Sequence, residues 1–213
     1  MRVSVLEVVV AAVVLALSAG AARATAPHLD IAAEGGFILS GEAQEIILSS
    51  GQMRGFQGHE VLGVESRVST LPWSSFVAVS YKVGGFVDVG DPEDFDSLLK
   101  LRSQFIQVVA GRTFGLGAAS LSLGLGYSYI IDRFSMTSGG GTIKLRQETG
   151  SGCVLAARVT APLAGPVSIL WDYEFLVRPS VAASGRIGSV ATYDIRQGSV
   201  HHFVIGGLSI RVI

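Results

Sequence analysis

Charged residues recur on one face of several segments in which apolar and polar residues alternate. Inside a closed protein such charges would form a salt-bridge network, because a buried charge without a partner is costly. An ion path or gate, in which the pairs break and re-form, is the functional alternative. The ten residues are Glu34, Glu65, Arg67, Lys82, Lys100, Arg102, Arg158, Asp172, Glu174 and Arg211.

A second group with chemical potential contains His59, Ser199 and His201. Each histidine lies near the start of an alternating segment, and alternation places both on the same face as the charges. If one further strand separates their strands, the two histidines lie about 10 Å apart. A metal site or a Ser/His hydrolase would need these residue types, but polar residues at a water boundary need them equally. We therefore expect no catalytic, metal or cofactor site here.

The elements that position these residues are predicted strands. Val167–Val177 alternates throughout, with Trp171 and Tyr173 on its apolar face and Asp172 and Glu174 behind. A large apolar face backed by Gly, Ser and charge is typical of a strand between lipid and a polar lumen. Period-2 alternation predicts eight such segments: 28–39, 59–69, 74–84, 98–112, 119–132, 143–161, 167–177 and 200–212. In segment 98–112 we expect Leu101, Phe105 and Val109 to face outward and Lys100 and Arg102 inward.

The connections between these segments alternate in length: long, short, long, short, long, short, long. Long outer loops and short periplasmic turns are typical of transmembrane barrels with an even strand count. The fold class we predict is all-β, an eight-stranded antiparallel up-and-down transmembrane β-barrel with both termini in the periplasm. Ten strands result if the first or fourth outer loop hides a hairpin, at Glu45–Leu48 or Ala191–Arg196; these segments could equally extend strands above the membrane.

The N-terminus has the pattern of a secretory signal peptide: Arg2, an apolar run from Val8 to Leu17, and Ala22-Arg23-Ala24 as the cleavage site. We predict a cleaved signal at 1–24 and a barrel domain at 25–213. Charged residues make up 15% of the chain, the mean hydropathy is +0.50 and the net charge is −1, so nothing favours nucleic-acid binding. The single Cys153 cannot form an internal disulfide.

The C-terminal residues Gly206–Ile213 resemble the closing strand of small Gram-negative outer-membrane barrels, the OmpA and OmpX family. Leu208, Ile210 and Val212 match its alternating apolar positions, and Arg211 matches a basic residue that faces the lumen. The family's terminal aromatic is absent, and Ile213 adds one residue. The resemblance implies an outer-membrane location in a Gram-negative bacterium, recognition of the C-terminal strand by the barrel-assembly machinery, and contact with outer-membrane lipids and lipopolysaccharide. We expect a monomer.

The function we predict is a structural or surface-interaction role for an outer-membrane barrel with a polar, plugged lumen, without enzymatic activity. One alternative is a narrow channel for small hydrophobic or ionic solutes, as in OmpW-type barrels. Another is a rim enzyme acting on lipid A, although the motif of the known lipid A hydrolases and acyltransferases, His-x-Ser with a Glu a dozen residues on, is missing. The third is a soluble, exported, lipocalin-like barrel, which requires an apolar lumen and a polar exterior.

Overall fold

A computed structural model gives the architecture. It describes residues 25–40, 45–48, 51–54, 58–71, 74–85, 89–91, 94–138, 141–187, 191–197 and 199–212, with side chains placed in 27–39, 59–69, 74–85, 101–135, 147–180 and 199–212. The predicted signal peptide, residues 1–24, lies outside this range. Within the part of the chain that is described, no helix has the length and apolar character needed to cross a membrane.

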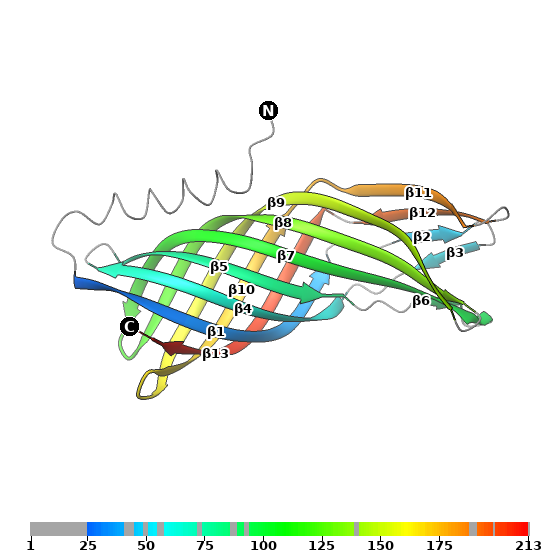
Figure 1. The fold of residues 1–213 in the computed structure, drawn as a ribbon. Helices are drawn as coiled ribbons and strands as arrows, with labels where there is room; N and C mark the ends of the chain where they lie inside the picture. Colours follow the sequence, from blue (N-terminus) through cyan, green and yellow to red (C-terminus); the bar gives the residue numbers. More distant parts are fainter. Residues whose placement is uncertain are drawn as a thin grey trace.

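Eight strands form a closed antiparallel barrel (Figure 1). They are β1 (Thr25–Ser40), β4 (Gly58–Leu71), β5 (Ser75–Gly84), β7 (Asp94–Leu116), β8 (Ala119–Ser138), β9 (Gly141–Ala164), β10 (Val167–Val177) and β13 (Val200–Arg211). Each pairs with the next in this order, and the pairing of β13 with β1 closes the ring. Closure leaves no open edge within the ring, which a membrane would not tolerate. The predicted fold class is therefore confirmed.

The connections β4–β5, β7–β8 and β9–β10 contain two or three residues each, and all three lie at the end of the barrel where β1 begins and β13 ends (Figure 1). We call this the turn end and the opposite one the loop end. Gly117 and Gly165 each occupy the first position of a two-residue turn, with φ of 66° and 53°. Glycine reaches this left-handed region without steric cost, and such turns suit the twist of a hairpin. The three predicted short connections are thus present. The fifth connection, which was predicted to be long, contains only residues 139–140, because β8 and β9 both continue past their predicted bounds.

At the loop end the chain forms further strands outside the ring. The four strands β2 (Glu45–Leu48), β3 (Gly51–Arg54), β11 (Val181–Ile187) and β12 (Ala191–Gln197) make a second sheet in the order β11-β12-β2-β3. The short β6 (Val89–Asp91) pairs with the extended end of β7. The segments 45–48 and 191–196, which could have made a ten-stranded barrel, are therefore strands. They pair with each other and not within the barrel.

The outer wall is apolar and the interior carries polar groups. Leu62, Leu125 and Trp171 are 71%, 62% and 62% exposed, whereas Lys82 and Gln107 inside are fully buried. This distribution argues against a soluble barrel with a polar exterior. The predicted facing holds along β1, β4, β5, β8, β9 and β10, where the outward residues other than Val77 are exposed or half-buried and the opposite ones are mostly buried or half-buried.

The predicted facing of β7 is wrong. Leu101, Phe105 and Val109 are buried inside the barrel, while Arg102 is exposed on the wall. Phe105 lies opposite Lys82 of β5 and Ile130 of β8, both of which point inward. Because directly opposite residues share a face of the sheet, the two neighbouring strands fix the facing of β7. Its own sequence is ambiguous, since apolar residues occur on both faces at Phe105–Ile106 and Val108–Val109.

Candidate functional site in the barrel interior

The inward side chains of β10 give the order of layers along the barrel. From the turn end they are Leu170, Asp172, Glu174, Leu176 and Arg178, and all five are buried. Their spacing of two residues follows from the pleat, which sends alternate side chains to the same face. Asp172 and Glu174 belong to a layer of ion pairs, Leu176 to an apolar layer and Arg178 to a second polar layer.

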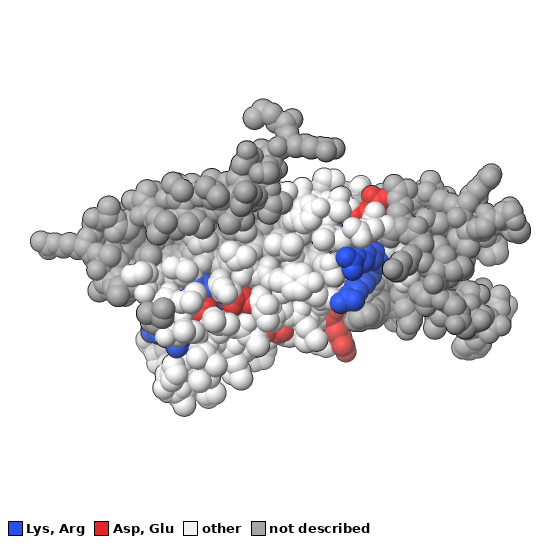
Figure 2. Space-filling view, viewed as in Figure 1, with Lys and Arg blue, Asp and Glu red and all other residues white. Residues whose placement is uncertain are grey.

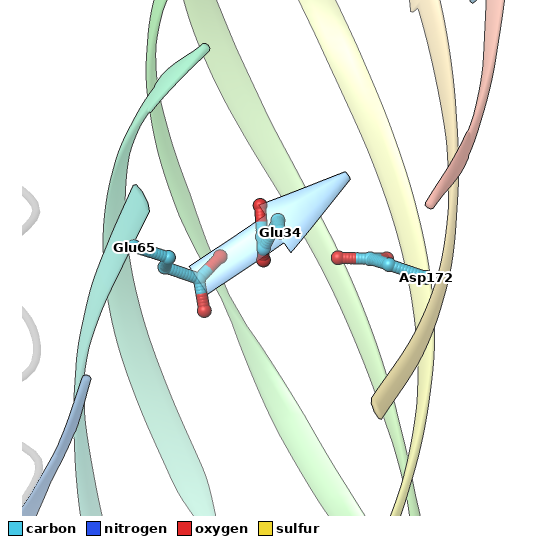
Figure 3. A group of neighbouring side chains, drawn as sticks. All are labelled: Glu34, Glu65 and Asp172. Carbon is cyan, nitrogen blue, oxygen red and sulfur yellow. The ribbon is translucent and has the colours of Figure 1, made fainter. Parts of the chain in front are cut away.

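The first ion-pair layer is centred on Arg158. Figure 3 shows Glu34, Glu65 and Asp172 projecting from three strands toward the middle of the lumen. Oxygens of these carboxylates lie within 4.8 Å of one another. The Arg158 guanidinium donates to all three: Nη2 to Glu34 Oε1 at 2.6 Å, Nε to Asp172 Oδ2 at 3.0 Å, and two nitrogens to Glu65. The planar fork of arginine allows this multiple contact.

Lys82, which pairs with Glu174, lies one layer further toward the loop end and is fully buried. Its ammonium donates to Glu174 and to Gln107 Oε1 at 2.9 Å, and it lies 3.7 Å from Glu34 Oε2. Gln107 also accepts a hydrogen bond from Ser80 at 3.0 Å. Glu34 therefore contacts both Arg158 and Lys82 and joins the two groups into one network. We call these six charged residues the lumen network: Glu34, Glu65, Lys82, Arg158, Asp172 and Glu174.

The lumen network connects strands across the barrel. Its six members come from β1, β4, β5, β9 and β10, and the pair Glu34–Arg158 is separated by 124 residues in sequence. The network holds four carboxylates and two cations, so replacing Arg158 or Lys82 would leave buried carboxylates without their cation, which costs about 3–5 kcal/mol. The arrangement can hold the wall together from inside.

An apolar layer lies beside the network. The Phe105 and Phe203 rings meet edge to face with centroids 5.1 Å apart, and Phe203 lies 5.8 Å from the Lys82 ammonium. Ile38, Ile130 and Leu176 join the same buried cluster, each at 0% exposure.

The second polar layer, toward the loop end, contains Asp132 and Arg178. Arg178 Nη1 donates to Asp132 Oδ2 at 2.8 Å, and Ser103 donates to Asp132 Oδ1 at 2.6 Å. This pair was not among the predicted site residues. The signal was present in the sequence, because Arg178 continues the inward alternation of β10 one step past the predicted strand end.

His59 and His201 lie in the same part of the lumen. Both are buried, at 7% and 2% exposure, and Ser199 is half-buried. His59 pairs with Ile38 and His201 with Ser40, on opposite sides of β1. Two strand spacings and a two-residue offset separate their backbones by more than about 10 Å. Among the side chains described, neither histidine belongs to a trio of metal-type ligands; the one such trio is Glu34, Glu65 and Asp172, which Arg158 contacts.

The remaining predicted lumen charges lie nearer the turn end or elsewhere. Arg67 is buried, stacks on the Phe76 ring at 3.7 Å and donates weakly to Thr113 at 3.4 Å. Arg211 is 59% exposed and pairs with Asp30 at 3.4 Å. Arg102 lies on the wall, so its predicted place in the lumen is wrong. The side chain of Lys100 is outside the described residues.

A cavity of about 230 Å³ occupies the turn end of the lumen. Hydroxyl groups dominate its polar lining, and its charged lining residues include Asp30, Arg67, Arg158 and Arg211. The lumen network borders this cavity, because Glu65 and Arg158 also line it. Water can fill a polar space of this size.

No protein-family model matches the sequence, and no curated protein sequence matches it. Several solved structures align with the chain. The chain aligns with the outer membrane protein OprG from Pseudomonas aeruginosa at a TM-score of 0.55 and 14% identity, over 86% of this chain and 95% of that one. The fold is that of outer-membrane β-barrels. Neisserial surface protein A aligns at a TM-score of 0.43 and 13% identity, covering 88% and 98% of the two chains. Ail, the attachment invasion locus protein of Yersinia pestis, aligns at 0.41 and 13%, covering 84% and 97%.

Proposed function

We propose that this protein is an outer-membrane β-barrel of a Gram-negative bacterium. In this proposal the lumen of the barrel is closed, and the protein binds other molecules at its loop end. The observation that carries the proposal is the contrast between an apolar wall and a buried lumen network. An exterior with Leu62 at 71% exposure needs a hydrocarbon surrounding, because contiguous apolar surface of this extent is unfavourable in water. The fold shared with OprG supports the same location.

The closed lumen is supported by two stacked obstructions. Lys82, bound to Glu174 and Gln107, fills one level, and the rings of Phe105 and Phe203 fill the next. A narrow eight-stranded ring can be filled by side chains in this way. Conduction would require an ion to displace both levels and to separate paired charges.

The loop end carries the interaction role in this proposal. A membrane strand needs only about 9–11 residues to cross the hydrocarbon. β7, β8 and β9 contain 23, 20 and 24 residues, and the second sheet adds four strands. An extended β-structure beyond the membrane offers a stable surface for contact with other molecules of the cell envelope or its surroundings.

A two-part experiment tests the proposal. Protein from purified outer membranes should migrate faster on a gel before boiling in detergent than after it, as folded barrels do. In planar bilayers the wild type should show no stepwise conductance, whereas F105A/F203A with K82A should conduct. Steady conductance by the wild type would overturn the closed lumen, and recovery of the protein in the soluble fraction would overturn the location.

A narrow channel remains the second candidate, because the 230 Å³ polar cavity reaches from the mouth to the lumen network. If the protein is a channel, the lumen network is its gate. Variants in which Glu174 or Asp172 is neutralised should then conduct more than the wild type. The same bilayer recordings distinguish the two candidates.

A further inference from the structure

Two arginines lie directly opposite each other on the outer wall. Arg102 of β7 pairs with Arg133 of β8, and both side chains are exposed. Directly opposite residues in an antiparallel pair have Cα atoms about 4.5–5.5 Å apart. Like charges at such positions destabilise a sheet unless something between them supplies opposite charge.

Among the described side chains, no carboxylate forms an ion pair with either arginine of this pair. Arg133 Nε donates to the amide oxygen of Gln147 at 3.3 Å, a neutral partner. Glu60 is the exposed carboxylate closest in the register, and Gly85, which donates to the Glu60 carbonyl, lies between its strand and Arg102. That places Glu60 two strand spacings away, about 10 Å. Within the described side chains, the guanidinium N–H groups other than Arg133 Nε are therefore available to a ligand.

The pair is also at a defined level of the wall. One step toward the turn end the register gives Gln104–Ile131, and the next step gives Ile106–Tyr129. Below these lie the exposed apolar side chains of the barrel, among them Leu123 and Leu125. Figure 2 shows a patch of Lys and Arg colour at the loop-end border of the pale wall, with Asp or Glu colour at the lower edge of the patch. The pair thus occupies the boundary where an apolar wall passes into water.

We propose that Arg102 and Arg133 bind the phosphate of an anionic lipid headgroup in the outer leaflet. This inference rests on the proposed membrane location and assigns a lipid contact to particular residues. Guanidinium groups bind phosphate through paired, charge-assisted hydrogen bonds, and two facing groups can share one phosphate. A lipid is favoured over a soluble anion because its acyl chains would lie against the apolar residues directly below the pair.

The test titrates a phosphorylated lipid into folded protein. Wild type, R102Q/R133Q and R112Q are folded in one zwitterionic detergent, and folding is checked by the heat-dependent gel shift. Binding of diphosphorylated lipid A is followed by native mass spectrometry, with a dephosphorylated form of the same lipid as reference. Arg112 is the matched control, because it is an exposed arginine on the same strand at the other end of the wall.

We expect R102Q/R133Q to bind the phosphorylated lipid about tenfold more weakly than wild type, as expected for loss of one charge-assisted contact or more. R112Q and the dephosphorylated lipid should show that the loss depends on this pair and on phosphate. Equal binding by wild type and the double variant would overturn the assignment, as would an equal loss in R112Q. Full displacement of the lipid by millimolar inorganic phosphate would overturn the choice of a lipid ligand. A wild type that shows no gel shift would instead contradict the membrane location.

Discussion

Arg158 lies inside the barrel against three carboxylates, whereas Arg102 and Arg133 face each other on the wall with no carboxylate partner among the described side chains. The interior charge is largely buried and is neutralised by protein groups, because desolvation without a partner costs several kcal/mol. The wall charges are in contact with solvent or headgroups, which can supply counter-charge. The same residue type is therefore structural in one region and available for binding in the other.

The largest effect should come from removing the interior cation. Arg158→Gln leaves Glu34, Glu65 and Asp172 within 4.8 Å of one another without their guanidinium. We expect a loss of about 3–5 kcal/mol in the free energy of unfolding, measured by urea titration of the folded barrel in detergent. Arg211→Gln, at the exposed mouth, is the control and should change stability little. Equal stability of R158Q and wild type would show that the lumen network does not brace the barrel.

A smaller loss of stability should follow from removing the other cation of the lumen network, Lys82. Lys82→Met should cost about 3 kcal/mol, because Glu174 loses its buried partner. The double variant K82M/E174M should recover most of this loss, since it replaces a buried ion pair with apolar groups of similar volume. A double-mutant cycle on unfolding free energies measures the coupling. If the double variant were less stable than the single one, the pair would contribute more than it costs to desolvate.

The wall can be tested by placing a charge in it. Leu125→Arg, near the middle of the apolar band, should destabilise the barrel in a bilayer by about 2–4 kcal/mol, whereas Leu163→Arg beside the turn at Gly165 should cost about 0–1 kcal/mol. Both leucines are similarly exposed, at 62% and 64%. Their difference therefore reports depth in the membrane. Equal effects in lipid vesicles would contradict a hydrocarbon surrounding for this face.

The smallest expected effect concerns the wall arginines in the absence of anionic lipid. Arg102→Gln removes a like-charge neighbour of Arg133 and should leave stability unchanged or raise it by less than about 0.5 kcal/mol, since solvent screens exposed charges. The measurement is urea unfolding in a zwitterionic detergent. A clear loss of stability would mean that Arg102 has a structural partner on the protein.

Much of the fold could be predicted from alternation alone. β8 and β10 each have one face of large apolar residues and one of small or charged residues, so their facing follows from their own sequence. β7 could not be assigned in this way, because the lumen needs apolar Phe105 while the wall accepts Arg102. The facing of such a strand is decided by its partners.

The site was predictable only as a set of residue types on a common face. Which charges would meet depends on how far the strands are staggered around the ring, and residues such as Glu34 and Arg158 meet across 124 positions. Arg178 and Gln107 were missed for different reasons. Arg178 lies beyond the predicted end of its strand, and Gln107 alternates in step with Phe105 and Val109, which were expected to face outward. In the structure Gln107 accepts from Lys82 and Ser80.

The second sheet has a consequence for the order of assembly. β2 lies in the connection after β1, and β12 in the connection before β13, so the pairing of β12 with β2 bridges the first and last strands of the ring. Those two strands meet only when the barrel closes, because β1–β13 is the last seam between the chain's ends. The sheet is therefore expected to form late and to act as a clasp over that seam. In a pulse-chase experiment, protease protection at residues 45–48 and 191–197 should arise only after closure. Protection of this sheet therefore reports when the barrel is complete.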